Sequence, residues 1–197
     1  MKVNYDNLMQ EQIKKLQGRA KLLLHSCCAP CSSAVIERLK EHFDITVYYY
    51  NPNIDDREEF VLRAKEQERL CKELGVGYYC PNYNEQEFYE KVQGLEKEKE
   101  GGARCVNCFL LRLESTAKYA SDNGYEYFAT TLTVSPLKNA QIINETGEKL
   151  QDGYDIKYLF SDFKKKGGYL RSIELSKQYD LYRQNYCGCS YSKKVSD

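Results

Sequence analysis

The segment that most constrains the fold is a short apolar run followed at once by a loop filled with thiols. Residues 22–24 are all leucine, His25 and Ser26 follow them, and residues 27–31 read Cys-Cys-Ala-Pro-Cys. The apolar positions that come next, at roughly helical spacing, are Val35, Ile36, Leu39 and Phe43. The pattern predicts a buried strand, a tight loop and a helix. In α/β proteins, reactive groups lie in such a loop, at the carboxyl end of a strand and facing a helix amino terminus.

Strand-like and helix-like segments alternate along the rest of the chain. Asp55 and Glu58 have the spacing of an amino-terminal helix cap, and Gly75 is placed to end that helix. We expect further strands over residues 45–50, 77–80 and 125–134, and further helices over 4–17, 85–100, 105–124, 138–150 and 172–182. Strands separated by helices imply a parallel sheet with helices on both faces. The expected architecture is a single α/β domain over 1–197, with a helical N-terminal extension over about 1–20 and a basic, cysteine-containing C-terminal segment over about 162–197.

The number of cysteines limits the chemistry. The chain has 9, an odd number, and its first twenty residues are polar and lysine-rich with no apolar signal core. No run of 18 or more apolar residues is present, so we expect a cytoplasmic protein without a membrane span. Clustered thiols in a reducing compartment indicate metal ligation or redox chemistry far more often than structural disulfides.

Seven of these cysteines fall into three groups with ligand-like spacing. The groups are Cys27, Cys28 and Cys31; Cys105 and Cys108; and Cys187 and Cys189. We expect all seven to be metal ligands. The adjacent Cys27 and Cys28 are expected to point in different directions, and so to serve two metal centres, or one metal and the substrate. A thioredoxin-like redox pair is the alternative for Cys105-x-x-Cys108, but that motif should follow the first strand of its unit. Cys71 is expected in the core, and Cys80 as a bystander near the site.

Other candidate residues surround the thiols. His25 precedes the cysteine loop and is a candidate proton donor or partner of the thiols; a satisfied, partly buried histidine is the alternative. From residue 164 to 194 there are eight Lys or Arg against two acidic residues, interleaved with tyrosines. This composition indicates an RNA-contacting surface, with a merely solvated basic face as the alternative. The candidate RNA-binding residues are Lys138, Lys164, Lys165, Lys166, Arg171 and Arg183.

Five separated blocks of the chain resemble the QueH-type epoxyqueuosine reductases. The blocks are residues 24–31; 104–108 with Arg112 and Leu113; 130–132 with Ser135 and Pro136; 162–165; and 182–189. The resemblance implies reductive removal of the epoxide oxygen of epoxyqueuosine at the wobble position of a tRNA with a GUN anticodon. It also implies a 4Fe–4S cluster beside a second, mononuclear iron, with electrons from an unidentified donor. The candidate catalytic residues are Cys27, Cys31 and His25.

The architecture resembles the adenine-nucleotide α-hydrolase-like (HUP) group, whose Rossmann-type fold is a parallel sheet flanked by helices. In that group the first loop normally cradles pyrophosphate with glycines and serines, whereas here it carries cysteines, so ATP use is not expected. Spacing leaves the ligand sets open. In one partition, the ligands of the cluster are Cys28, Cys105, Cys108 and either Cys187 or Cys189. The iron is then held by Cys27 or Cys31 together with the remaining member of the Cys187/Cys189 pair.

The sequence is also compatible with two other functions. The first is an iron–sulfur-dependent tRNA sulfur-transfer enzyme on the same scaffold, which would need the missing ATP loop. The second is a zinc-binding RNA module without catalytic activity, which predicts a colourless protein instead of a brown one.

Overall fold

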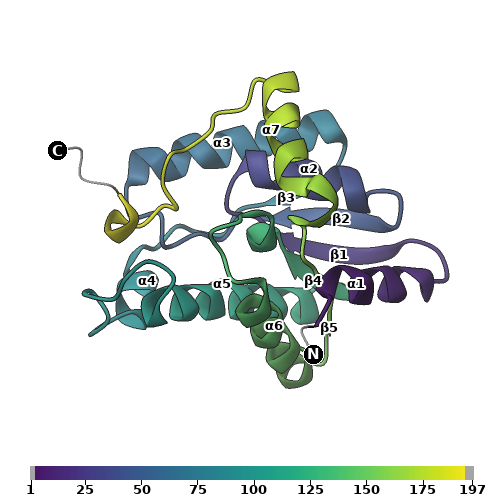
Figure 1. Cartoon of the computed structure of the whole chain (residues 1–197), viewed down its shortest axis with the longest axis horizontal. Helices are drawn as coiled ribbons and strands as arrows, with labels where there is room; N and C mark the ends of the chain where they lie inside the picture. The colour runs from purple at the N-terminus through teal and green to yellow at the C-terminus, as the bar shows by residue number, and fades with distance from the viewer. Residues whose placement is uncertain (1–2, 194–197) are drawn as a thin grey trace.

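Figure 1 shows the computed structural model, which describes residues 3–193; residues 1–2 and 194–197, including Lys194 of the basic tail, lie outside the described part. Its centre is a parallel sheet of 5 strands in the order β3-β2-β1-β4-β5. The strands are β1 (Ala20–His25), β2 (Phe43–Tyr48), β3 (Gly77–Tyr79), β4 (Tyr127–Thr130) and β5 (Lys157–Tyr158). The predicted parallel sheet is therefore confirmed.

Helices cover both faces of this sheet. The α-helices are α1 (Tyr5–Lys14), α2 (Ala29–Leu39), α3 (Arg57–Leu74), α4 (Gln86–Lys91), α5 (Ala103–Asp122), α6 (Ala140–Tyr154) and α7 (Gly168–Gln178). Short 3-10 turns are η1 (Thr131–Val134), η2 (Lys165–Gly167) and η3 (Ser190–Ser192). Helices α2, α3 and α7 lie on one side of the sheet, and α5 and α6 on the other (Figure 1). Within residues 3–193, no helix has both the length and the apolarity needed to cross a membrane.

The leucine run of β1 builds both cores. Because successive strand residues point to opposite faces, Leu22 and Leu24 pack with Val35 of α2 on one side. Leu23 points to the other side and packs with Leu113 of α5. All of these side chains are buried, as is usual for a central strand of a parallel sheet that is covered on both faces.

The order of the strands decides where a ligand can bind. From β1 the chain crosses to β2 through α2 on one face, whereas β4, on the other side of β1, leads into α6 on the opposite face. The loops after β1 and β4 therefore run apart and leave a crevice at the carboxyl ends of the strands, which is the usual ligand site of open α/β sheets. The cysteine loop that follows β1 lies at this point.

Several helix predictions need correction. The helix expected over residues 85–100 is only α4, because Arg104 donates hydrogen bonds to the backbone carbonyls of residues 95, 96 and 98 and holds them in turns. The cap of α3 is Asp56 rather than Asp55, since the Asp56 carboxylate accepts from the backbone N–H groups of residues 58 and 59. The predicted end of that helix is confirmed: Gly75 has a left-handed backbone, with φ of 67°.

The strand boundaries also differ from the expectation. Phe43 opens β2 instead of closing the preceding helix. The strand expected over 125–134 stops at Thr130, whose side chain accepts from the N–H of Leu132 and starts the η1 turn. The two-residue strand β5 has no counterpart in the sequence prediction. The last two long helices are shifted from 138–150 to 140–154 and from 172–182 to 168–178.

Candidate functional site

The first group of sulfurs sits where β1 turns into α2. Cys28 is the N-cap of α2 and Pro30 lies in its first turn, where a missing N–H costs nothing. The sulfurs of Cys27, Cys28 and Cys31 all lie within 4.8 Å of one another, and those of Cys27 and Cys28 are 3.8 Å apart. The sulfurs of Cys27 and Cys28 therefore do not diverge, and the expectation that they serve two separate centres is wrong. Three sulfurs this close can bind a single metal ion.

Buried amide side chains hold this loop in place. Ser26 Oγ donates to Gln67 Oε1 of α3 at 2.7 Å, and Gln67 Nε2 donates to Ser32 Oγ at 2.8 Å. Asn51, just beyond β2, donates from Nδ2 to the Ser26 carbonyl at 2.8 Å. The loop is thus fixed from α3 and from the end of β2, so the sulfurs are held in position without a bound ligand.

His25 connects the carboxyl ends of three strands next to the cysteine loop. It is fully buried, with Nδ1 2.9 Å from Thr130 Oγ1 of β4 and Nε2 3.1 Å from the carbonyl of Tyr50 beyond β2. A carbonyl only accepts, so Nε2 carries the hydrogen and Nδ1 accepts from the threonine hydroxyl. Burial, followed by the charge of Arg112, lowers the pKa of His25 to about 3. The ring is therefore neutral at physiological pH.

The second group of sulfurs comes from two distant parts of the chain. Cys105 and Cys108 lie in the first turns of α5, and Cys187 and Cys189 lie in the C-terminal segment. All four line one small pocket with the rings of Phe88 and Phe109. The structure therefore brings together the two pairs that lie about eighty positions apart in the sequence.

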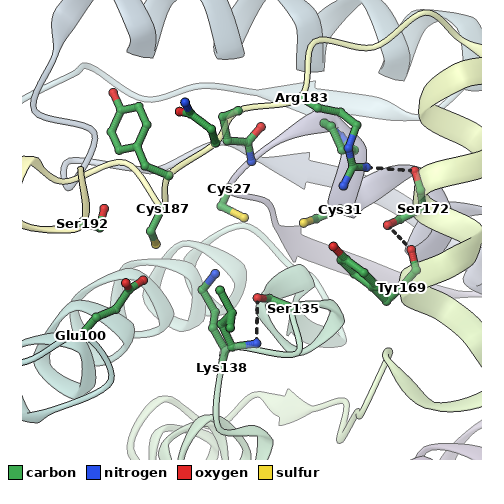
Figure 2. Close-up of a pocket in the computed structure, with 15 residues that line it drawn as sticks. Cys27, Cys31, Glu100, Ser135, Lys138, Tyr169, Ser172, Arg183, Cys187 and Ser192 are labelled. Atoms are coloured by element: carbon green, nitrogen blue, oxygen red, sulfur yellow. Dashed lines mark hydrogen bonds between the residues drawn. The ribbon is translucent and has the colours of Figure 1, made fainter. Parts of the chain in front are cut away.

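Cys187 connects the two groups. It lines the four-cysteine pocket and also a larger cavity of about 260 Å³ that contains Cys27 and Cys31. Figure 2 shows the sulfurs of Cys27 and Cys31, and the side chain of Lys138, directed into that cavity. Cys28 does not line the four-cysteine pocket in the described part of the chain. The structure thus groups Cys28 with Cys27 and Cys31 rather than with Cys105 and Cys108.

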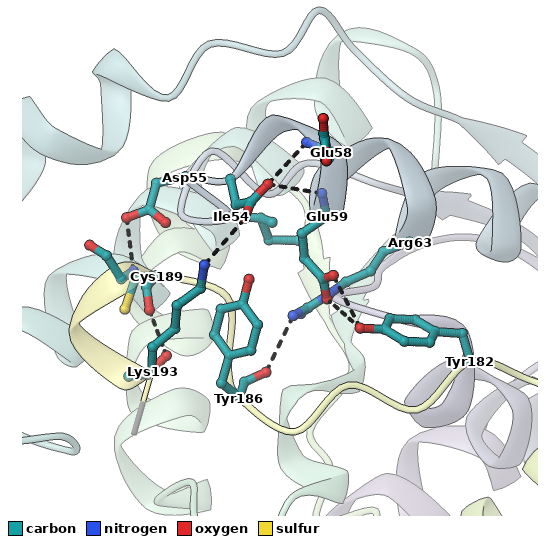
Figure 3. A network of polar contacts seen from close by, with 12 residues as sticks. Ile54, Asp55, Glu58, Glu59, Arg63, Tyr182, Tyr186, Cys189 and Lys193 are labelled. Carbon is teal, nitrogen blue, oxygen red and sulfur yellow. Dashed lines mark hydrogen bonds and ion pairs between the residues drawn. The ribbon is translucent and has the colours of Figure 1, made fainter. Parts of the chain in front are cut away.

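The C-terminal segment is held in place by the loop after β2 and by α3 (Figure 3). Arg63 of α3, which is 1% exposed, donates to the Cys187 carbonyl at 3.0 Å and is itself paired with Glu59 at 2.6 Å. The N–H of Ser190 donates to the Asp55 carboxylate at 2.8 Å. These contacts fix the backbone at Cys187 and directly after Cys189.

The residue between these two cysteines has to be glycine. Gly188 has φ of 144°, a region that L side chains rarely adopt. A Cβ atom at this position would lie 2.8 Å from the side chain of Ile54 and 3.1 Å from that of Asn53. The segment can therefore approach the loop after β2 closely enough to deliver both sulfurs only because position 188 lacks a side chain.

The sulfurs differ in how readily they ionise. Hydrogen bonding with Cys28 and Cys31 lowers the pKa of Cys27, so a thiolate in this group forms there first. The pKa of Cys28 is raised to about 12, mainly by the same interaction with Cys27. Burial raises the pKa of Cys108 to about 12. Metal binding would supply the positive charge that makes thiolates stable at such buried positions.

A buried guanidinium lies beside the second group. Arg112 of α5 is fully buried; its Nε donates to the Cys108 carbonyl at 3.1 Å, and its Nη1 and Nη2 have no partner within residues 3–193. Burial lowers the pKa of Arg112, but the charges of Cys108, Cys187 and Cys27 outweigh it and raise the pKa overall. A buried cation with unpaired donors costs several kcal/mol unless an anionic group faces it. A metal centre held by thiolates is such a group.

The comparisons with known proteins agree with this geometry. The family model described as "Epoxyqueuosine reductase QueH" matches residues 22–195. The chain belongs to the QueH family. Curated members named epoxyqueuosine reductase QueH include one from Staphylococcus epidermidis, 45% identical over 97% of this chain and 85% of its own length. Another, from Thermotoga maritima, is 34% identical over 87% of this chain and 89% of its own length.

Solved structures with a similar fold are more distant in sequence. The U34-tRNA thiolase NcsA of Methanococcus maripaludis, solved with its [4Fe-4S] cluster, has a TM-score of 0.56 at 13% identity and matches 95% of this chain and 68% of its own. A predicted tRNA methyltransferase subunit of Methanocaldococcus jannaschii has a TM-score of 0.55 at 15% identity, over 80% of this chain and 74% of its own. These likenesses confirm the expected HUP-like, Rossmann-type fold.

In this QueH family member, the basic residues assigned to RNA contact have different surroundings. Lys138 and Arg183 line the cavity, and Arg183 Nη1 donates to Ser176 Oγ at 3.0 Å. Lys164 pairs with Asp162 at 2.7 Å, Lys166 with Asp6 at 3.4 Å, and Arg171 with Glu37 at 2.8 Å. Lys165 is exposed and forms no ion pair within residues 3–193. Much of the positive charge counted in the sequence is therefore already neutralised.

The remaining two cysteines lie apart from both groups. Cys71 is fully buried among the apolar side chains on the α2 side of the sheet, which confirms the predicted core cysteine. Cys80 follows β3, is half-buried, and has its sulfur 3.6 Å from the carbonyl of Pro81. Neither lines the four-cysteine pocket or the larger cavity.

The positions of Arg63 and Arg112 near the cysteines were not predicted from the sequence. A signal existed for Arg112: it follows Cys108 by four positions in a predicted helix, and so lies on the same face. No comparable signal marks Arg63, because its contact with the C-terminal segment spans 124 positions.

Proposed function

We propose that this protein reduces epoxyqueuosine in tRNA to queuosine. The reaction consumes two electrons and two protons, releases the epoxide oxygen as water, and leaves a carbon–carbon double bond. The observation that carries the proposal is the meeting of seven cysteines in two adjacent groups at the carboxyl end of β1. Membership of the QueH family supports it.

We assign a ligand set to each group of sulfurs. Cys105, Cys108, Cys187 and Cys189 line one pocket and supply the four thiolates of a 4Fe–4S cluster. Cys27, Cys28 and Cys31 hold a second, mononuclear iron, within reach of the cavity. When bound, the cluster supplies single electrons and the iron supplies Lewis acidity toward the epoxide oxygen. The unpaired guanidinium of Arg112 supports the fit, since it requires an anionic neighbour.

The protein's own side chains shape the substrate site. Tyr169 lines the cavity and offers its ring for stacking the modified base after it leaves the anticodon stack. The cavity of about 260 Å³ is close to the smaller ligand sites of proteins, roughly 300 Å³, so it suits a single nucleoside. Burial lowers the pKa of Lys138, but the charges of Cys187, Cys27 and Cys31 raise it overall, so its ammonium group holds its proton. We assign Lys138 the role of stabilising negative charge on the departing oxygen.

We give His25 a positioning role instead of a proton-transfer role. Both of its ring nitrogens are engaged with Thr130 and Tyr50, and its lowered pKa leaves it without an acidic proton at neutral pH. It fixes the ends of β1, β2 and β4 relative to one another. Cys27 thereby keeps its place above Thr131, whose Oγ1 lies 4.0 Å from the Cys27 sulfur.

The direct test is conversion of the substrate by anaerobically purified, iron-replete protein. With dithionite in place of the unidentified electron donor, we expect tRNA with a GUN anticodon to lose the epoxide oxygen from its epoxyqueuosine, without ATP. Nucleoside mass spectrometry of the recovered tRNA measures the conversion. If the wild-type protein binds iron and sulfide but removes no oxygen, the proposal is wrong. If it binds zinc and stays colourless, an RNA-binding module without this chemistry is the better description.

We also propose that the basic residues contact tRNA phosphates. Replacing Lys164, Lys165 and Lys166 together with glutamine should weaken binding of all tRNAs alike. Because Lys164 and Lys166 already pair with acids, we expect the slope of log affinity against log salt to fall by about 0.7–0.9, the value of a single phosphate contact. Filter binding between low and high salt measures the slope. Lys149→Gln on α6 serves as the control; an unchanged slope in the triple variant would mean that the lysines form only a solvated face.

A further inference from the structure

The side chain of Arg112 is unusual because it combines full burial with unused hydrogen-bond donors. It is 0% exposed, yet Nη1 and Nη2 have no partner within residues 3–193. Only Nε is satisfied, by the Cys108 carbonyl at 3.1 Å. Arginine almost never enters a protein interior unpaired, because a buried, unsatisfied guanidinium loses its hydration without replacement.

The surroundings of the guanidinium indicate what its free donors face. Arg112 lines the pocket of Cys105, Cys108, Cys187 and Cys189. Its guanidinium carbon lies 5.7 Å from the centre of the ring of Phe109, a residue that also lines the pocket. Since Arg112 is fully buried, the phosphates of an RNA cannot reach it from outside. The anion that it pairs with therefore lies inside the pocket.

We infer that Arg112 donates hydrogen bonds from its Nη groups to the sulfur atoms of the cluster, and so raises the reduction potential of that cluster. This inference rests on the proposed iron–sulfur function and adds a residue that sets the electronic properties of the site. A cluster with four thiolates carries net negative charge, and each added electron increases it. Hydrogen bonds and positive charge at the sulfurs stabilise the reduced state more than the oxidised state.

The inference is tested by an EPR-monitored redox titration of the full chain, reconstituted anaerobically. We expect the midpoint potential of Arg112→Met to be more negative than that of the wild type, with Arg112→Lys in between because it keeps the charge and loses the two-pronged geometry. Thr116→Val, one turn further along α5, is the matched control. Thr116 is equally buried and donates only to the Arg112 backbone carbonyl at 2.7 Å, so its replacement should leave the potential unchanged.

A second measurement on the wild type covers the case in which the variants do not fold. With ¹⁵N-labelled arginine, the reduced cluster should show a weak hyperfine coupling to an arginine nitrogen, as detected by pulsed EPR. A wild-type cluster without such a coupling, or an Arg112→Met cluster with the wild-type potential, would overturn the inference while leaving the proposed function intact. A wild-type protein that assembles no cluster would instead refute the proposed function itself.

Discussion

Replacing Cys105 and Cys108 together with serine should give an anaerobically purified protein that is colourless and inactive. Both residues line the four-cysteine pocket, and Cys108 is buried. Serine oxygen is a poor ligand for iron–sulfur clusters compared with thiolate, so losing two of four ligands should remove the cluster altogether. Iron and sulfide analysis, together with the visible absorption spectrum, measures the loss, and nucleoside mass spectrometry should show no conversion.

Cys71→Ser is the matched control for this experiment. Cys71 is a buried cysteine like Cys108, but it lies in the core on the other side of the sheet, where Gln67 Nε2 donates to its sulfur at 3.5 Å. We expect its serine variant to keep the cluster and to lose ~1–3 kcal/mol of unfolding free energy, the cost of burying a hydroxyl. Full iron and sulfide content in the Cys105/Cys108 double variant would mean that the cluster is held elsewhere.

How far the sequence predicted the fold depended on how local each signal was. The β1–loop–α2 unit and the end of α3 at Gly75 were predicted correctly, because hydrophobic spacing and a helix-ending glycine act within a few residues. The charged stretch after α4 was predicted as helix and is mostly turns. Its backbone carbonyls are bonded by Arg104 of α5, a contact that no local pattern reveals.

The candidate site was likewise predictable only where the signal was local. The spacing of the cysteines identified them as candidate ligands, but their division into two groups depends on the path of the C-terminal segment. That path is set by Arg63, by Asp55 and by the close approach of Gly188 to Ile54. These contacts join positions more than a hundred residues apart, so periodicity and spacing carry no information about them. The same holds for the ion pair of Lys166 with Asp6, whereas the partner of Lys164, Asp162, is only two positions away.

Replacing Cys27 or Cys31 is also expected to have a large effect on turnover. Cys27→Ala and Cys31→Ala should each keep the 4Fe–4S cluster, because the four-cysteine pocket is intact, but lose the second iron. Both sulfurs lie in the cavity, so the loss acts where the substrate binds. A metal acting as a Lewis acid contributes several kcal/mol to such a reaction, and turnover should therefore fall by roughly 100-fold or more.

The ratio of iron to sulfide shows whether the protein holds the cluster alone or the cluster together with the second iron. Iron and sulfide should stand at a ratio of about five to four in the wild type, which contains a 4Fe–4S cluster and one iron, and at one to one in either alanine variant. Cys80→Ala is the control, because Cys80 is half-buried and lies outside both sites. It should keep the wild-type ratio and wild-type turnover. If Cys27→Ala and Cys31→Ala also keep both, the thiol loop after β1 does not hold a metal, and the site of oxygen removal has to be sought among the remaining residues of the cavity.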